Sequence, residues 1–187
     1  MKHLILVTSP PACGKTFVSK ALAKALKPIV YLDKDTLIVL SKQIFKVANE
    51  EINRSSQFFE DHIRNYEYDA IFDVALEALE YCDLALINAP YAREIRNPAA
   101  LDAMREKLAK VGAELTVIWV QTDIEVCRQR MINRNSDRDT WKLENWDEYV
   151  ATQNFTKPDI ENLIIFNNSN EEEFNESIAR ISAQLKG

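Results

Sequence analysis

The chain has 187 residues, enough for one domain with a substantial hydrophobic core, and its 47% apolar and 28% charged residues are ordinary for a globular protein. A formal net charge of −6 argues against bulk binding of nucleic acid, which needs a basic surface, but it leaves a short nucleic-acid end open as a substrate. The cysteines, Cys13, Cys82 and Cys127, lie far apart in the sequence and predict neither a disulfide nor a zinc site. This favours a reducing compartment, the cytoplasm, and because every apolar run is too short to span a bilayer, we expect no membrane association.

Short apolar runs alternate with helical patterns along the chain. The strands expected from these runs cover residues 4–7, 29–32, 84–87, 115–120 and 163–166. Helical spacing of apolar residues predicts helices over 15–26, 36–48 and 58–81, then from 97 to near 112, from 122 onward, and from 170 to 185. Continuous rather than alternating hydrophobicity is typical of parallel strands covered on both faces. The pattern therefore predicts a three-layer α/β fold with a five-stranded parallel sheet.

Two helix starts carry the capping-box pattern, in which two side chains satisfy each other's free backbone N–H groups. Thr122 and Glu125 form one expected box, and Asn170 and Glu173 form the other. Residues 36–82 lie between the second and third strands, and we expect them to form a helical lobe inserted in a single domain.

The segment from Ser9 to Thr16, SPPACGKT, matches the phosphate-loop pattern GxxxxGK[ST], except that Ser9 replaces the first glycine. With a strand before the segment and a helix after it, backbone N–H groups would converge on a bound anion. This context disfavours the alternative, in which the match to the pattern is accidental and Lys15 is simply solvated. Lys15 is expected to reach the β- and γ-phosphates of ATP, Thr16 to ligate Mg²⁺, and Gly14 to keep a Cβ away from the phosphates. The residues expected to bind the cofactor are Ala12, Cys13, Gly14, Lys15, Thr16 and Phe17.

This P-loop, the acidic turn after the second strand and an arginine-rich segment near residue 130 resemble the small P-loop kinases. Within that group the chain resembles a predicted-kinase family under a general AAA heading, similar in fold to polynucleotide kinase, zeta-toxin and chloramphenicol phosphotransferase. The resemblance implies that an Asp just after the second strand takes the proton of the acceptor hydroxyl. Asp35 matches that position best, and Asp33 is the second candidate. The alternative for either residue is a turn-forming or helix-capping role.

The third strand ends at Asn88, where many relatives would place a magnesium-holding Asp. A neutral amide can still orient a metal-bound water, and we expect the metal site to consist of Thr16, Asp33 and Asn88. The sequence leaves open whether Asn88 lowers activity.

The cation-rich segment over residues 128–147 resembles a kinase lid. Arg130, Arg134 and Arg138 would close over the triphosphate and offset negative charge in the transition state. The alternative is that these arginines form surface ion pairs with the acidic residues between 137 and 144, which contribute little stability. The polar loop 167–169 is expected either to contact adenine or to form a plain turn.

The combined pattern predicts an ATP- and magnesium-dependent phosphotransferase that moves the γ-phosphoryl group to a hydroxyl of a small molecule or nucleotide. The segment 156–159, TKPD, resembles a guanine-recognition motif, but it precedes a strand instead of following one and so does not indicate a GTPase. Two alternatives remain open: a regulatory ATP-binding or ATPase module without an acceptor, and a kinase of nucleic-acid ends, which would need a basic groove leading to Asp35. Residues that could hold an acceptor are Asn53, Arg54, His62, Arg64, Arg93 and Arg96.

Overall fold

A five-stranded parallel sheet forms the centre of the protein in the computed structural model, which describes residues 2–136 and 139–186. The strand order is β2-β3-β1-β4-β5, and every neighbouring pair is parallel. The strands are β1 (Lys2–Thr8), β2 (Val30–Asp33), β3 (Leu84–Asn88), β4 (Ala113–Gln121) and β5 (Ile164–Asn167). All five lie within one to three residues of the predicted positions, and the α/β prediction is confirmed.

The first strand lies at the centre of the sheet because its apolar run is continuous. Leu4, Ile5, Leu6 and Val7 are all 0% exposed. Leu4 and Leu6 pack into the cluster under α4 and α5, while Ile5 and Val7 pack into the cluster under α1 and α9. A strand with two buried faces needs apolar side chains at every position, which explains the absence of alternation.

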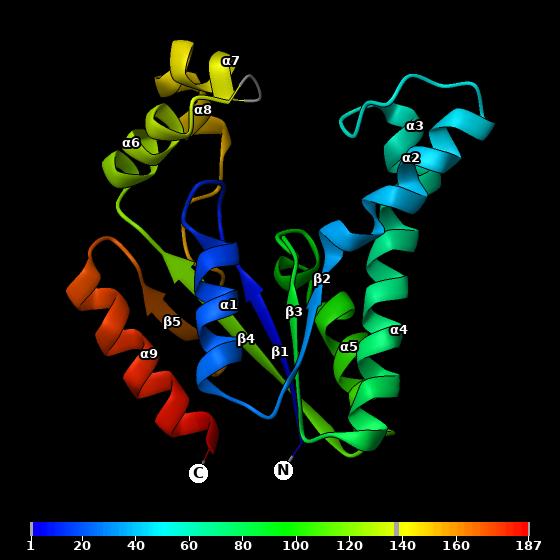
Figure 1. Cartoon of the computed structure of the whole chain (residues 1–187), viewed down its shortest axis with the longest axis vertical. Helices are drawn as coiled ribbons and strands as arrows, with labels where there is room; N and C mark the ends of the chain where they lie inside the picture. The colour runs from blue at the N-terminus through cyan, green and yellow to red at the C-terminus, as the bar shows by residue number, and fades with distance from the viewer. Residues whose placement is uncertain (1, 137–138, 187) are drawn as a thin grey trace.

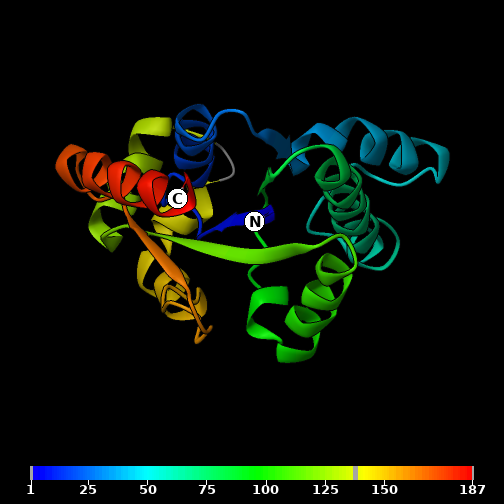
Figure 2. The ribbon, with the colours of Figure 1, turned by 90° about the horizontal axis from the view of Figure 1, so that it is seen from below.

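Helices cover both faces of the sheet and complete three layers (Figures 1 and 2). The helices on the sheet are α1 (Lys15–Ala25) and α9 (Glu171–Lys186) on one face and α4 (Asn65–Tyr81) and α5 (Pro98–Ala109) on the other. Among the described residues, no helix combines the length and the apolar character that crossing a bilayer requires.

Two groups of shorter elements rise above the carboxyl edge of the sheet, on either side of the loop that joins β1 to α1 (Figure 1). The first group consists of η1 (Lys34–Leu37), α2 (Ile38–Val47), α3 (Gln57–Phe59) and the π-helix η2 (Glu60–Arg64). The second group consists of α6 (Ile124–Arg134), α7 (Thr140–Glu144) and α8 (Trp146–Thr152). The first group has a small core of its own, in which Phe45, Phe59 and Ile63 are buried. These groups occupy the regions in which the sequence predicts a helical lobe and a lid.

The helix starts test the two predicted capping boxes. Asn170 accepts a hydrogen bond from the Glu173 N–H at 2.9 Å, which confirms one half of this box, whereas the Glu173 carboxylate accepts from the N–H of Ser169, at 3.0 Å, and not from that of Asn170. The box of Thr122 and Glu125 is wrong, because α6 begins after Asp123 with no side-chain cap. The Thr122 hydroxyl instead donates a hydrogen bond to the carbonyl of Cys13, 109 residues away.

Candidate nucleotide-binding and catalytic site

The phosphate loop joins β1 to α1 in a left-handed backbone conformation. Ala12 has φ 64° and Gly14, the residue before the helix, has φ 84°. A Cβ on Gly14 would lie 2.5 Å from Nδ2 of Asn168, so glycine is required both by the backbone angle and by this neighbour. The sequence analysis attributed this requirement to a bound phosphate alone.

The carbonyl group of Cys13 anchors the loop to residues that follow β4 and β5 and to helix α6. It accepts hydrogen bonds from the Thr122 hydroxyl at 3.0 Å, from Nδ2 of Asn168 at 2.7 Å and from Nη1 of Arg130 at 3.3 Å. Arg130 also donates to the carbonyl of Asn168 at 2.7 Å. In this structure, then, Arg130 and Asn168 hold the loop in shape, and neither lines the cleft in front of it. Their proposed contacts to phosphate and adenine remain predictions.

Two cysteines that are far apart in the sequence are in contact behind this loop. The Sγ atoms of Cys13 and Cys127 lie 3.5 Å apart, and both side chains are buried. The hydrogen bond to Cys127, together with burial, raises the pKa of Cys13, and the two cysteines are free, without a disulfide between them. The sequence could not reveal this contact, because the two cysteines are 114 residues apart and meet only where α6 packs against the loop.

Asn88 lies at the centre of the polar network below the loop. Its Oδ1 accepts hydrogen bonds from Nζ of Lys15 at 2.6 Å and from the Ser19 hydroxyl at 3.3 Å. Its Nδ2 donates to the Thr16 hydroxyl at 3.2 Å and to the Asp33 carboxylate at 2.9 Å. The strand register places these groups together, because Asn88 pairs with Val7 on one side and with Asp33 on the other.

This network fits the expected cofactors. The Thr16 hydroxyl and the Asp33 carboxylate are hard oxygen donors that suit Mg²⁺, and Asn88 turns its amide nitrogen toward both of them while its amide oxygen faces Lys15. Among the described residues, no side chain caps the N-terminus of α1, so its N–H groups are available to an anion. Burial lowers the pKa of Lys15, and this lysine meets a neutral amide rather than a carboxylate within ion-pair distance.

The two candidate bases have different environments. Asp33 accepts hydrogen bonds from Asn88, from the Asp35 N–H at 3.1 Å and from the Tyr31 hydroxyl at 3.0 Å. Burial alone would raise the pKa of Asp33, but these hydrogen bonds outweigh it and hold the pKa below its usual value. The side chain of Asp35 is 74% exposed and lines the cleft, 3.8 Å from Nζ of Lys34. Asp35 is therefore the carboxylate that a ligand in the cleft can reach.

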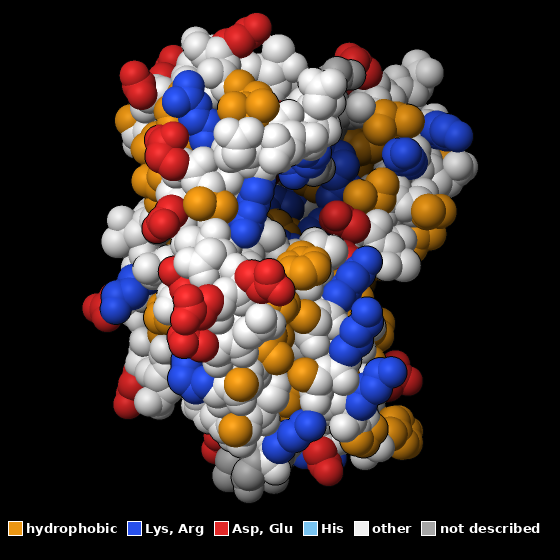
Figure 3. Space-filling view, turned by 60° about the vertical axis from the view of Figure 1, so that its left-hand side comes forward, with side chains coloured by type: hydrophobic (Ala, Val, Ile, Leu, Met, Phe, Trp, Pro, Cys, Tyr) orange, Lys and Arg blue, Asp and Glu red, His pale blue; other side chains and the backbone are white. Residues whose placement is uncertain are grey.

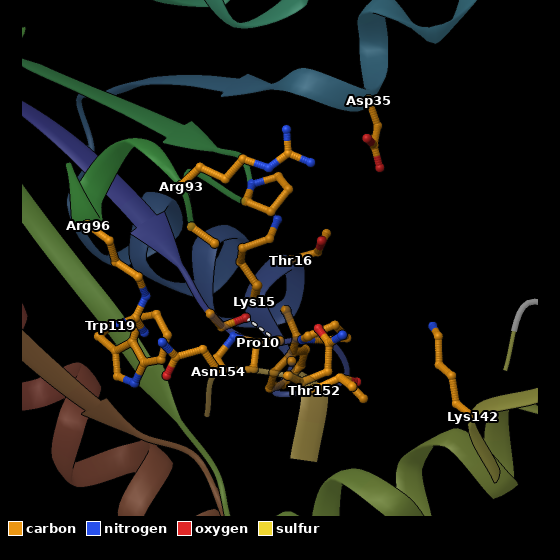
Figure 4. Close-up of a pocket in the computed structure, with 18 of the residues that line it drawn as sticks. Pro10, Lys15, Thr16, Asp35, Arg93, Arg96, Trp119, Lys142, Thr152 and Asn154 are labelled. Carbon is orange, nitrogen blue, oxygen red and sulfur yellow. Dashed lines mark hydrogen bonds between the residues drawn. The ribbon is translucent and has the colours of Figure 1, made fainter. Parts of the chain in front are cut away.

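The cleft in front of the loop has a volume of about 1030 Å³. Figure 3 shows it as a hollow between the two raised groups of helices, with Lys and Arg side chains gathered inside. Figure 4 shows Lys15 and Thr16 on its floor, Asp35 on one side and Lys142 on the other. Phe17, which was expected to bind the cofactor, also lines the cleft and is 65% exposed, and its contact with a nucleotide stays a prediction.

The residues of the predicted lid lie in different surroundings. Arg134 lines the cleft and is paired with the buried Asp139, which Lys142 also contacts at 3.1 Å. Hydrogen bonds from Arg134 and Lys142 overcome the effect of burial and hold the pKa of Asp139 below its usual value. Arg138 lies outside the described residues, and its role stays a prediction.

Several polar residues of the inserted lobe face inward instead of toward the cleft. Arg54 forms two hydrogen bonds with Glu67, at 2.6 and 2.7 Å, and Arg64 pairs with Glu94 at 2.8 Å. His62 packs against the ring of Phe58. These residues therefore stabilise the lobe, and neither Arg54, Arg64, His62 nor Asn53 lines the cleft that holds Asp35.

Six residues on the cleft lining were not identified from the sequence: Pro90, Ala92, Trp119, Thr152, Gln153 and Asn154. Trp119 lies in the fourth predicted strand, where its position is typical of a core residue. Pro90 and Ala92 follow β3, and the last three residues lie at the end of α8 and just after it, in a stretch with no motif. Arg93 and Arg96, which the sequence suggested as residues that could hold an acceptor, also line the cleft, with Arg96 beside Trp119 (Figure 4).

The fold and the loop together define the class: the chain has the three-layer fold of the P-loop kinases. A family model described as an AAA domain matches residues 4–156, and the chain belongs to that family. No curated protein sequence matches the chain significantly.

Solved structures with the same fold match the chain over nearly its whole length. A provisionally assigned kinase from Chloroflexus aurantiacus j-10-fl has a TM-score of 0.64 and 17% identity, covering 99% of this chain and 96% of the other. The APS kinase of Mycobacterium tuberculosis has a TM-score of 0.57 and 17% identity, covering 100% and 98%. A gluconokinase from Sinorhizobium meliloti 1021 has a TM-score of 0.55 and 14% identity, covering 99% and 95%. At these identities the likeness concerns the fold.

Proposed function

We propose that this protein is an ATP- and Mg²⁺-dependent phosphotransferase that moves the γ-phosphoryl group to a hydroxyl of a small molecule or nucleotide. The observation that carries the proposal is that Lys15 of the phosphate loop and the accessible carboxylate of Asp35 face one cleft. The kinase names of proteins with the same fold, among them a gluconokinase and an APS kinase, support it. The cytoplasmic location and the lack of bulk nucleic-acid binding stay predictions from composition.

Each part of the loop has a role in this proposal. The backbone N–H groups from Ala12 to Thr16 hold the β- and γ-phosphates at the start of α1, with Lys15 supplying positive charge. Thr16 and Asp33 would hold Mg²⁺, which would neutralise phosphate charge when bound. Asn88 would support this metal site by orienting its ligands, because its Nδ2 donates hydrogen bonds to the Thr16 hydroxyl and to the Asp33 carboxylate.

Asp35 orients the acceptor hydroxyl and takes its proton as the oxygen attacks phosphorus. Asp33 is less suited to that step, since its carboxylate is already committed to three hydrogen bonds. Arg134 and Lys142, which meet at the buried Asp139, approach the triphosphate from the lid, and Arg138 would join them.

The test is transfer of label from γ-labelled ATP with Mg²⁺ to pooled acceptors: sugars, sugar acids, nucleosides, antibiotics and short oligonucleotides. We expect one pool to be labelled. Lys15→Ala should lower the rate about a hundredfold to a thousandfold, as loss of a charge-stabilising donor does, and Asp35→Asn should lower it about a hundredfold.

Matched controls are Lys24→Ala and Asp73→Asn, since both residues are exposed on helices outside the cleft lining. These variants should transfer label at the wild-type rate. Slow phosphate release that Lys15→Ala abolishes and Asp35→Asn leaves unchanged would instead indicate an ATPase module without an acceptor.

A further inference from the structure

The cleft carries an excess of positive charge in an acidic protein. The chain has a formal net charge of −6. The charged residues that line the cleft are nevertheless five cations and, among the described residues, one carboxylate: Lys15, Arg93, Arg96, Arg134 and Lys142 against Asp35. Figure 3 shows Lys and Arg side chains gathered in the hollow, in addition to those elsewhere on the visible face. Such local charge favours anionic ligands in the cleft.

Most of these cations have a partner or an expected ligand. Arg134 and Lys142 contact Asp139, and Arg93 forms two hydrogen bonds with Glu60, at 2.7 and 3.1 Å. Lys15 belongs to the phosphate loop, so the triphosphate accounts for its charge. Arg96 is the remaining cation of the five, with neither a carboxylate partner among the described residues nor an expected ligand.

Arg96 is held in place without being neutralised. Its guanidinium group donates a hydrogen bond to the carbonyl of Thr156 and lies 5.4 Å from the centre of the Trp119 ring. Within residues 2–136 and 139–186 it forms no ion pair. Burial lowers its pKa from the ordinary value, which shows that the positive charge is partly removed from water without a compensating carboxylate. A fixed, unpaired arginine at the wall of a cleft is suited to a planar oxyanion.

The position of this arginine separates it from the triphosphate. Arg93 and Arg96 belong to the short segment after β3, on the side of the loop away from Lys142 (Figure 4). In Figure 4, Lys15 lies between Arg96 and Asp35, and Arg93 extends toward the space above Lys15. Lys142, a cation of the lid, lies on the opposite side (Figure 4). This wall therefore belongs to the acceptor rather than to ATP.

We propose that the acceptor is a small hydroxylated molecule that carries a carboxylate or phosphate ester group, and that Arg96, assisted by Arg93, binds that anionic group. This inference rests on the proposed function. The acceptor oxygen forms a bond to the γ-phosphorus, the bond from the γ-phosphorus to the bridging oxygen breaks, ADP leaves, and the hydroxyl proton passes to Asp35. A neutral acceptor of the same shape would leave Arg96 without an ionic partner, which makes the anion a determinant of specificity.

The first experiment measures binding without chemistry. The full chain is saturated with Mg²⁺ and a non-hydrolysable ATP analogue, and matched probes are titrated by calorimetry: gluconate and glucose 6-phosphate against glucose, and cytidine monophosphate against cytidine. We expect an anionic member to bind at least tenfold more tightly than its neutral match. Equal affinities, or no binding by any anionic probe, would overturn the inference.

Variants assign the effect to the arginine wall. Arg96→Gln should weaken binding of the anionic probe at least tenfold while the affinity for the ATP analogue is unchanged, and Arg96→Lys should restore part of it. The control is Arg105→Gln, because Arg105 pairs with Asp102 on the surface of α5. Since Arg96 also contacts Trp119, the exposed Arg93→Gln serves as a second variant that keeps this packing. If Arg96→Gln and Arg93→Gln both bind the anionic probe with wild-type affinity, these arginines do not bind the anionic group of the acceptor.

The outcome is separate from that of the proposed function. If an anionic probe binds through Arg96 but no label is transferred, the anion site stands and the phosphotransferase proposal fails. If label passes equally well to neutral and anionic acceptors, the protein is a phosphotransferase and the anionic acceptor is wrong.

Discussion

The phosphate loop and the inserted lobe both contain buried polar groups, but they satisfy them in different ways. In the lobe, Lys34 and Arg54 pair with the carboxylate of Glu67, at 2.7 and 2.6 Å. At the loop, Lys15 meets the neutral amide of Asn88. In the lobe the cations are neutralised by a buried carboxylate and stabilise the fold, whereas Lys15 has a neutral partner and keeps its charge for a ligand. This difference separates Lys34 and Arg54, which stabilise the lobe, from Lys15, which can bind phosphate.

The lobe and the phosphate loop also differ in the groups that stabilise them: a buried carboxylate in the lobe and a backbone carbonyl at the loop. Glu67 is 4% exposed and accepts hydrogen bonds from Lys34, Arg54 and Ser41. The loop depends on backbone conformation and on one carbonyl, that of Cys13, which Thr122 and Asn168 hold with neutral donors. We therefore expect the lobe to be sensitive to loss of charge and to pH, and the loop to be sensitive to shape.

The largest expected effect is on the lobe. Glu67→Gln leaves the buried Lys34 without its carboxylate and should lower the free energy of unfolding by about 3 to 5 kcal/mol. Urea denaturation monitored by fluorescence measures this. Glu80→Gln, on the exposed face of the same helix, is the control and should change stability by less than about 0.5 kcal/mol. A small effect at Glu67 would show that the lobe does not depend on its ion pairs.

The same carboxylate predicts an acid limit. Burial acts to raise the pKa of Glu67, but the hydrogen bonds from Arg54, Lys34 and Ser41 prevail and lower it from 4.5 to about 2. The stabilisation is therefore fully present above the unfolded value and is lost as the pH falls through the folded one. Urea denaturation between about pH 5 and pH 2 should show a decline in wild-type stability that is reduced in Glu67→Gln. An equal decline in both proteins would contradict the assignment.

The next effect tests the shape of the loop. Gly14→Ala places a side chain at φ 84° and 2.5 Å from Asn168, whereas Gly112→Ala does so at φ 70° with nothing within 4 Å. Gly112→Ala should lose about 1 to 2 kcal/mol of stability through backbone strain. Gly14→Ala should lose more, and it should also lose affinity for the ATP analogue in calorimetry. If the two variants lose equal stability and both retain nucleotide binding, Asn168 does not constrain the loop.

The smallest effect concerns one anchoring hydrogen bond. Thr122→Val removes a donor to the Cys13 carbonyl and should cost about 1 kcal/mol in urea denaturation. Thr8→Val is the matched comparison, because the buried Thr8 hydroxyl has no hydrogen-bond partner among the described residues. Replacing it should leave stability unchanged or raise it slightly. Equal losses at both positions would indicate a packing effect, not loss of the anchor.

The sequence by itself determined the sheet, the phosphate loop and the order of elements. These features are local: a buried strand requires a continuous apolar run, and the loop residues Gly14, Lys15 and Thr16 act where one strand turns into one helix. The cap at Asn170 was likewise predictable, because its partner lies three residues away. Asp35 could be placed at the same edge of the sheet as the phosphate loop, because the carboxyl ends of parallel strands share one edge.

Only the tertiary structure decided which polar side chains face the cleft. Arg130 and Thr122 turn toward the carbonyl of Cys13, more than 100 residues earlier, and Arg54 turns inward to Glu67. Over residues 2–136 and 139–186, Arg96 has no carboxylate partner, and its neighbours are Trp119 and a backbone carbonyl. An arginine has the same sequence signal in all of these settings. Its role depends on whether a carboxylate, a carbonyl or open space lies within reach, and that is set by how distant elements pack.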